Sequence, residues 1–367
     1  MQNLKDGIFE DISLIEYIKR SGKSVVLYGM GDGAVKLLSI LNSHGIVPVG
    51  IFASDEFVRY NKFCSYTVKK LSDIEAEFDD FIILVAFATS LDSVRNHIFS
   101  LSERHPIFVP DINVAGDPLE IFDTSFYNEN YERLNLVYSR LDTRSKEVFS
   151  TLINFKISGK IEYLKRLEEL RLEEKIPYDT KKITSFADLG AYTGDTLKEA
   201  VSLYPNLKKA ICFEPDNKSF KKLETTALSL CVDTTLINGA AHLENTTLEI
   251  FEGASRNTIL QDNAFESSLL QKKKVREIKA FRPDKTSSFI PDLIKMDVEG
   301  SEISALEGCR GFFEKASPVM RISIYHNNRD LFEIFEKIEE IKKGYKFSLS
   351  QKCAYIPAWD IELVAYN

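Results

Sequence analysis

The sequence predicts an α/β protein in which two Rossmann-like, doubly wound sheets are joined by a helical segment. Apolar, β-branched runs alternate with amphipathic stretches from about residue 24 to residue 113, and the same alternation returns after residue 181. From about residue 118 to residue 175, glycine is almost absent and apolar residues recur at intervals of three and four, as they do in helices. We therefore expect a smaller α/β domain over residues 1–113, a helical linker over 114–180 and a larger α/β domain over 181–367.

The first predicted unit begins at Ser24 with "SVVLYGMGDGAVKLLSILNSHG", which indicates a strand, a glycine turn and a helix. The runs "IVPVGIF", "DFIILVAFA" and "HPIFVP" are typical of further strands, and "SLDSVRNHIFSL" is typical of a helix. The turn supplies Gly29, Gly31 and Ala34 at the spacing G-x-G-x-x-A, and Asp55 follows the next strand. That spacing alone predicts a dinucleotide site. A structural turn that has no ligand explains it equally well.

The larger domain repeats the alternation. Strands are predicted at "SFADLG", "KAICFE", "TTLING", "TLEIFEG", "DLIKMD" and "MRISIYH", and helices at "TLKEAVSLY", "NKSFKKLETTALSL", "EISALEGCRGFFEK" and "DLFEIFEKIEEI". Most of these units should form one parallel sheet. The final runs "YKFSLS" and "IELVAYN" have no helix between them, so we expect a C-terminal antiparallel hairpin at the sheet edge.

Ligands in such sheets bind beyond the carboxyl ends of the strands. The first strand of the larger domain leads into a turn with Asp188, Gly190, Gly194 and Thr196, where backbone N–H groups can approach a ligand. Glu214 ends the second strand, at the spacing where an acid accepts both ribose hydroxyls of an adenosine-type cofactor. The turn and the acid together predict a cofactor site.

The stretch "KMDVEGSE" places Asp297 and Glu299 two residues apart at the end of the fourth strand. Acids that point into a ligand site need not pack in the core. They are compatible with binding a cofactor ammonium group, orienting an acceptor hydroxyl or holding a divalent metal, and also with a plain acid pair at a helix N-terminus. His326 ends the next strand, where an imidazole can act as a general base towards a hydroxyl.

Composition excludes several classes of protein. The net charge of -8 has no broad basic footprint, so nucleic acid is not an expected partner, and we interpret the basic run at Lys272–Lys274 as a solvated face. The five cysteines form no CxxC pair, so neither a disulfide framework nor a structural metal site is predicted. No leader and no apolar run of membrane-spanning length is found, so we expect a cytoplasmic protein that does not insert into membranes.

The segments "FADLGAYTGDT", "CFEPDNKSFKKL", "DLIKMDVEGSEISALEGC" and "ISIYHNNRDLFEI" resemble, in order, the motifs of FkbM-type S-adenosylmethionine-dependent methyltransferases. The resemblance covers most of residues 143–367, and "KMDVEGSE" followed by "ALEG" is its most specific part. It implies a class I methyltransferase fold that binds S-adenosyl-L-methionine and methylates a hydroxyl, commonly on a sugar. We therefore expect an O-methyltransferase of glycan, polysaccharide or nucleotide-sugar biosynthesis.

The resemblance also implies roles for individual residues. The implied cofactor-binding residues are Asp188, Gly190, Ala191, Tyr192, Gly194, Thr196, Glu214, Pro215, Asn238 and Asp297. Asp297 and Glu299 would face the reacting centre, and His326 is the predicted base. No metal-ligand set is predicted, while a divalent metal at the acid pair and a nucleotide at the N-terminal turn stay open.

Two other functions are compatible with the sequence. The N-terminal glycine fingerprint favours an NAD-dependent enzyme that acts on a nucleotide sugar, although no Tyr-x-x-x-Lys pair follows it. Alternatively, two Rossmann-like domains could serve as the docking surfaces of a non-catalytic scaffold in a glycan-assembly complex. The stretch "EYLKRLEELRLEEK" is compatible with a homodimer face, but such short helical spacing is also typical of intramolecular packing.

Overall fold

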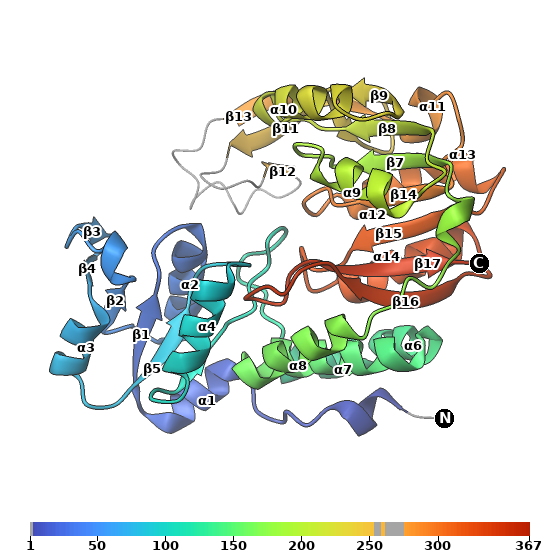
Figure 1. Ribbon diagram of the computed structural model, residues 1–367. Coiled ribbons are helices and arrows are strands. Elements are labelled where there is room, and N and C mark those ends of the chain that lie inside the picture. Colours follow the sequence, from blue (N-terminus) through green and yellow to red (C-terminus); the bar gives the residue numbers. More distant parts are fainter. Residues whose placement is uncertain (1–2, 253–257, 261–274) are drawn as a thin grey trace.

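The computed structural model describes residues 3–252, 258–260 and 275–367. An N-terminal α/β domain lies beside a larger C-terminal α/β domain, and a layer of helices runs along the edge of the larger sheet (Figure 1). This arrangement confirms the predicted α/β fold class, with a smaller and a larger α/β domain and a helical segment between them.

The N-terminal domain has a six-stranded sheet in the order β3-β4-β2-β1-β5-β6. All neighbouring pairs are parallel except β3 with β4. The strands are β1 (Ser24–Tyr28), β2 (Gly50–Phe52), β3 (Lys62–Phe63), β4 (Tyr66–Lys69), β5 (Phe81–Val85) and β6 (Ile107–Phe108), and the helices are η1 (Leu4–Gly7), α1 (Leu14–Ser21), α2 (Asp32–Ser43), η2 (Asp55–Phe57), α3 (Leu71–Glu77) and α4 (Asp92–Leu101). The edge hairpin of β3 and β4 was not predicted from the sequence, because its strands are too short to show the alternation of apolar and polar residues that is typical of strands.

Four helices follow, α5 (Thr124–Glu129), α6 (Tyr131–Arg140), α7 (Thr143–Ser158) and α8 (Ile161–Leu172). Helix α7 begins at the cap Asp142, whose side chain accepts a hydrogen bond from the backbone N–H of Ser145, and ends at Gly159 in the left-handed conformation. Almost every residue of α7 is buried, on all faces of the helix. Such a helix lies inside a core, so this segment is more than a linker between two domains.

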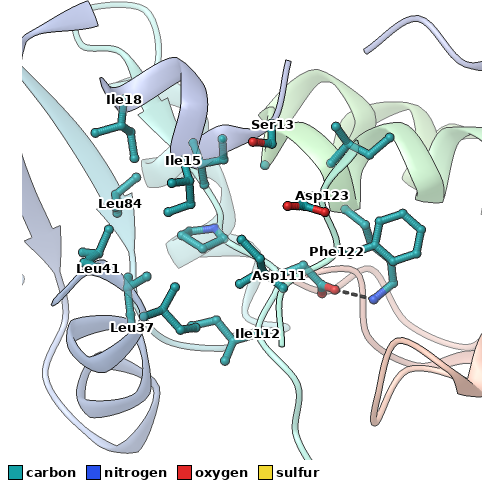
Figure 2. A pocket seen from close by; sticks show the side chains of 17 residues that line it. Ser13, Ile15, Ile18, Leu37, Leu41, Leu84, Asp111, Ile112, Phe122 and Asp123 are labelled. Atoms are coloured by element: carbon teal, nitrogen blue, oxygen red, sulfur yellow. Dashed lines mark hydrogen bonds and ion pairs between the residues drawn. The ribbon is translucent and has the colours of Figure 1, made fainter. Parts of the chain in front are cut away.

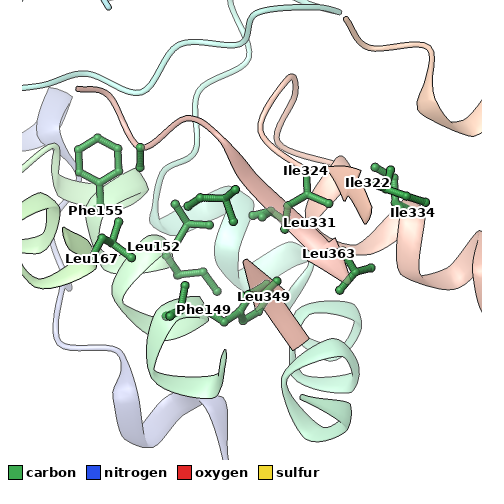
Figure 3. Close-up of a cluster of buried hydrophobic side chains, with 14 of the residues drawn as sticks. Phe149, Leu152, Phe155, Leu167, Ile322, Ile324, Leu331, Ile334, Leu349 and Leu363 are labelled. Atoms are coloured by element: carbon green, nitrogen blue, oxygen red, sulfur yellow. The ribbon is translucent and has the colours of Figure 1, made fainter. Parts of the chain in front are cut away.

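Figure 3 shows how α7 joins the larger sheet. Phe149, Leu152 and Phe155 of α7 belong to the same buried cluster as Leu349 and Leu363 of the C-terminal hairpin. The cluster also contains strand residues of the N-terminal sheet, such as Val26 and Ile83, so one continuous core connects all three parts. Leu164, Leu167 and Leu170 of α8 pack into this core, which is the intramolecular packing that we considered beside a dimer face.

The C-terminal domain has a seven-stranded sheet in the order β16-β17-β15-β14-β7-β8-β9. The strands are β7 (Ser185–Leu189), β8 (Lys209–Phe213), β9 (Asp233–Ile237), β14 (Leu293–Met296), β15 (Val319–Ser323), β16 (Lys346–Gln351) and β17 (Ile361–Tyr366). The helices are η3 (Thr180–Lys182), α9 (Asp195–Leu203), α10 (Asn217–Leu228), α11 (Pro283–Thr286), α12 (Glu302–Gly308), α13 (Arg310–Phe313) and α14 (Asp330–Ile341). The antiparallel pairing of β16 with β17 confirms the predicted C-terminal hairpin.

One predicted strand lies outside the main sheet, and one predicted helix is wrong in detail. The run "TLEIFEG" is not in the main sheet; it forms β11 (Thr246–Glu252) in a separate four-stranded sheet with β10 (Ala240–Ala241), β12 (Thr258–Leu260) and β13 (Val275–Phe281). The single helix expected in "EISALEGCRGFFEK" is divided into α12 and α13. Gly308 ends α12, and a Cβ there would lie 2.1 Å from the carbonyl oxygen of His242, so close packing fixes this break.

The basic run Lys272–Lys274 lies outside the described residues. Within the described part of the chain, no helix has the length and apolar character that crossing a membrane requires.

Candidate active site at the strand ends of the C-terminal sheet

The turn after β7 brings the chain close to the neighbouring strand end. Gly190 has φ +89°, and a Cβ at this position would lie 1.9 Å from the carbonyl oxygen of Asp297. Gly194 also has a positive φ and immediately precedes α9, where it leaves the helix N-terminus without a side-chain cap. Only glycine fits this turn at residue 190, so the turn and the strand end of β14 are held in contact.

Glu214 lies next to this turn, just beyond β8. Its carboxylate accepts hydrogen bonds from the backbone N–H groups of Tyr192 (2.8 Å) and Asp216 (2.7 Å). Asn238 donates from its side chain to the Glu214 carbonyl at 3.1 Å. Burial raises the pKa of Glu214 to about 7, although both backbone hydrogen bonds lower it. Four predicted cofactor residues, Tyr192, Glu214, Pro215 and Asn238, therefore lie together.

Asp188 and Lys295 form a buried ion pair between β7 and β14. They are direct register partners, and Lys295 Nζ lies 3.5 Å from Asp188 Oδ1 and 3.8 Å from Asp297 Oδ2. Lys295 also donates to the carbonyl oxygen of Gly190 at 3.0 Å. Burial raises the pKa of Asp188 to about 6, which Lys295 opposes. Thr196, in the first turn of α9, lines a small internal space beside Lys295.

The structure brings Asp297, Glu299 and His326 together, and it adds Glu302, which the sequence analysis missed. We call these four residues the acid–imidazole cluster. His326 Nε2 lies 3.3 Å from Asp297 Oδ1 and 3.6 Å from Glu299 Oε2, while Nδ1 lies 3.0 Å from Glu302 Oε1. His326 and Glu302 are almost fully buried, whereas the side chains of Asp297 and Glu299 are 27% and 31% exposed. One side of the cluster is thus open to a ligand.

Charges within the cluster shift one another's pKa values. Burial favours neutral His326, but Glu302, Asp297 and Glu299 outweigh it and raise the His326 pKa well above its ordinary value. Burial also raises the pKa of Glu299 to about 7, with Asp297 and Glu302 adding to the effect. For Asp297, Lys295 and His326 outweigh the burial and lower the pKa. The surrounding acids therefore favour the protonated form of His326.

Aromatic side chains continue from the cluster. Tyr325 donates a hydrogen bond from its hydroxyl to Asp297 Oδ1 at 3.3 Å, and its ring centroid lies 6.0 Å from that of Trp359. Trp359 lies in the loop between β16 and β17. Sequence reasoning missed Tyr325, Trp359 and Lys295. The available signal for Glu302 was the spacing E-G-S-E, which places it three residues after Glu299.

Residues before the C-terminal domain also contact the site. The backbone N–H groups of Val114 and Ala115 both donate to the carbonyl oxygen of His326, at 2.7 and 2.9 Å. Lys36, in α2 of the N-terminal domain, donates to the carbonyl oxygens of Asn113 (3.1 Å) and Val114 (3.0 Å). The backbone of His326 is therefore connected to the N-terminal domain through two consecutive sets of hydrogen bonds.

The N-terminal glycine turn has a different environment. A Cβ on Gly29 would lie 2.5 Å from the ring of Phe87, and Ala34 is buried in the core of this domain. Gly31 begins α2 and has open space around its Cα. The Asp55 carboxylate lies 3.7 Å from Lys70 and is mostly exposed. The ring of Phe87 thus accounts for Gly29, whereas packing does not account for Gly31.

A cavity of about 30 Å³ lies where α1 and α2 meet the start of the linker (Figure 2). Leu37, Leu41 and Leu84 line its apolar side, and Asp111, paired with Lys156, lines the other. This volume suits a water molecule and is too small for an organic cofactor.

The chain is similar to known methyltransferases in part of its sequence and in its fold. Residues 188–349 match the model of the methyltransferase FkbM domain. The crystal structure of methyltransferase FkbM from Methylobacillus flagellatus KT is similar over 98% of this chain and 94% of its own, with a TM-score of 0.68 and 18% sequence identity. It therefore shares the overall fold, including the N-terminal part. No curated protein sequence matches the chain.

Two further structures match only part of the chain. A precorrin-6y C5,15-methyltransferase from Geobacter metallireducens GS-15 is 12% identical (TM-score 0.29; 55% of this chain and 86% of that one). An O-methyltransferase from neocarzinostatin biosynthesis, in complex with S-adenosyl-L-homocysteine and 1,4-dihydroxy-2-naphthoic acid, is 11% identical (TM-score 0.28; 52% and 51%). TM-scores this low do not establish a shared overall fold.

The close contact at Gly190 yields a stability prediction. Gly190→Ala should lower the free energy of unfolding in urea more than Gly344→Ala does. Gly344 has a similar φ of +99° but open space around it, so its substitution costs only the backbone strain of about 1–2 kcal/mol. The added methyl group at residue 190 must also displace the Asp297 backbone. If both variants lost the same free energy of unfolding, the close contact between Gly190 and Asp297 would not contribute to stability.

Proposed function

Because residues 188–349 form a methyltransferase domain of the FkbM type, we propose that the chain is an S-adenosyl-L-methionine-dependent O-methyltransferase that acts on a sugar hydroxyl. The observation that carries this proposal is the pairing of two sites on neighbouring strand ends. One is the glycine turn with Glu214, and the other is the acid–imidazole cluster. Their contact through Gly190 and Asp297 suits a reaction between two bound molecules.

The residues of the first site fit the proposed cofactor. Glu214 would accept the ribose hydroxyls, since a carboxylate has lone pairs left after two backbone hydrogen bonds. The uncapped N-terminus of α9 offers backbone N–H groups to the methionine carboxylate. Asp188 is fully buried, and neither of its oxygens has a hydrogen-bond partner within the described residues, which suits the cofactor's positive groups. The bound cofactor supplies a methyl group activated on a sulfonium.

The second site would hold the acceptor hydroxyl. Asp297 and Glu299 are partly exposed on the side of His326 Nε2, so a hydroxyl placed there meets three groups that can take or share its proton. Tyr325 and Trp359 extend this side with ring faces that suit the apolar face of a sugar. The segment after β14 also lacks the Asn/Asp-Pro-Pro-aromatic pattern of amide and nucleobase N-methylation. These features support oxygen, rather than nitrogen, as the methylated atom.

Glu214 is the first residue to test. Calorimetric titration of the full chain with S-adenosyl-L-methionine should show micromolar binding, and Glu214→Ala should weaken it at least tenfold because the ribose loses its acceptor. Glu224→Ala removes an exposed acid from α10 and should leave the affinity unchanged. If the wild type bound NAD and not S-adenosyl-L-methionine, the cofactor assignment would be wrong and the N-terminal turn would become the site to examine.

The affinity for S-adenosyl-L-methionine should depend on pH through Glu214. Its pKa of about 7 means that half of the ligand-free chains carry a protonated Glu214 at neutral pH. Ribose hydroxyls bind the ionised form better, so the affinity should rise as the pH passes upward through 7 and fall roughly tenfold per unit well below it. Titrations between pH 5.5 and 8 check this. Glu214→Ala serves as the control, and an identical slope in that variant would assign the effect to the ligand.

Methyl transfer itself can be followed with S-adenosyl-L-methionine labelled in the methyl group and a panel of nucleotide sugars and glycans. We expect the labelled methyl group on a sugar, in a bond that is stable to alkali, because methyl ethers resist alkali and methyl esters do not. His326→Ala should lower turnover at least 100-fold and leave cofactor affinity nearly unchanged, because His326 faces the acceptor side. His105→Ala, far from the site, is the matched control. If His326→Ala turned over at the wild-type rate, His326 would have no role in the reaction.

A further inference from the structure

The acid–imidazole cluster and the neighbouring ion pair of Asp188 with Lys295 contain more acidic than basic side chains. Asp188, Asp297, Glu299 and Glu302 are linked through ion pairs to Lys295 and His326. Among the described residues, Glu299 and Glu302 have no ion-pair partner other than His326. Four carboxyl groups are thus crowded around two basic groups in a largely buried site. A bound cation would relieve this crowding of acids.

The ligand atoms are unsatisfied in the way that a metal site requires. His326 is fully buried, and its Nε2 has no hydrogen-bond partner among the described residues, while Nδ1 lies 3.0 Å from Glu302 Oε1. Glu302 Oε2 is also buried without a hydrogen-bond partner in that part of the chain. Buried polar atoms are rarely left unpaired, so these groups point to an additional partner. Ligand atoms of Asp297, Glu302 and His326 lie within 4.8 Å of one another.

The distances fit a six-coordinate divalent ion. Adjacent ligands around a cation at about 2.1 Å lie about 3 Å apart in an octahedral shell. His326 Nε2 is 3.3 Å from Asp297 Oδ1 and 3.6 Å from Glu299 Oε2, so a small contraction would complete three ligand positions. Glu302, 3.0 Å from Nδ1, would take the outer position that orients a metal-binding imidazole and keeps its Nε2 lone pair free.

We propose that Asp297, Glu299 and His326 Nε2 bind a divalent cation such as Mn²⁺, with Glu302 orienting the imidazole from outside. Two carboxylates and one imidazole favour Mn²⁺ or Fe²⁺ over the harder Ca²⁺. The partial exposure of Asp297 and Glu299 leaves the remaining positions to water or to the acceptor. Cation binding at these residues does not rest on the proposed function; only its catalytic consequence does.

That consequence concerns the proton of the acceptor hydroxyl. A hydroxyl bound to the cation loses its proton to solvent at lower pH than a free one, as metal-bound water does. The oxygen then forms the new bond to the methyl carbon, and the carbon–sulfur bond breaks with its electron pair left on sulfur. His326 would be a ligand in this reaction and not the base, because one Nε2 atom cannot bind a cation and accept a proton together.

Mn²⁺ alone is the probe for this site. The chelator-treated full chain should bind about one Mn²⁺ saturably in an electron paramagnetic resonance titration. His326→Ala and Glu299→Gln should each weaken binding at least tenfold, and Glu307→Gln, which changes an acid of α12 that pairs with Arg310, should not. Pulsed electron paramagnetic resonance on the wild type should show magnetic coupling between the bound Mn²⁺ and an imidazole nitrogen. This readout needs no variant and so does not depend on how the substituted chains fold.

Two results would overturn the metal site: no saturable binding of Mn²⁺ below millimolar concentration, or bound Mn²⁺ without nitrogen coupling. Calorimetry with S-adenosyl-L-methionine on the same chelated protein separates this failure from failure of the proposed function. Cofactor binding without Mn²⁺ binding would still support the methyltransferase assignment. The proton of the acceptor hydroxyl would then be accepted by His326 or by the carboxylates. Mn²⁺ binding without cofactor binding would support the metal site and reject the proposed function.

Discussion

The burial of Lys295 between two aspartates is the constraint on which the site depends. Lys295 is the register partner of Asp188 across two adjacent parallel strands, and it reaches the Gly190 carbonyl and Asp297 from there. An ammonium group in this position cannot be left unpaired, so the two strand ends and the glycine turn must keep one relative position. The ammonium group of Lys295 thus contacts both the cofactor side of the site, at Asp188 and Gly190, and the acceptor side, at Asp297.

Much of this arrangement could be predicted from the sequence, because parallel strands end at the same edge of a sheet. Asp188, Glu214, Asp297 and His326 each follow a run that reads as a strand, and the structure places them on adjacent strand ends. Strand order is sufficient for this level of detail. Glu299 lies beyond the end of β14 with a positive φ, so the turn, and not strand periodicity, brings it to His326.

Other features have no local signal. The four-stranded sheet depends on a pairing between β11 and β13, which lie far apart in sequence, and "VREIKAF" reads as part of a basic run. Lys295 reads as an ordinary residue of an apolar strand until its partner across the sheet is known. Glu302 looks like a first-turn helix acid, which the helix dipole would explain by itself. Each of these roles arises from tertiary neighbours.

The two peptide N–H groups that hold the His326 carbonyl come from Val114 and Ala115, outside the region that matches the methyltransferase family. In evolutionary terms, the two halves of this chain are not interchangeable modules. A substitution that moves Lys36 or Asn113 would alter the backbone position of His326, so changes in the N-terminal domain and in the C-terminal domain would constrain one another. Recombination with the N-terminal half of a distant relative would have to bring its own linker to preserve the geometry of this histidine.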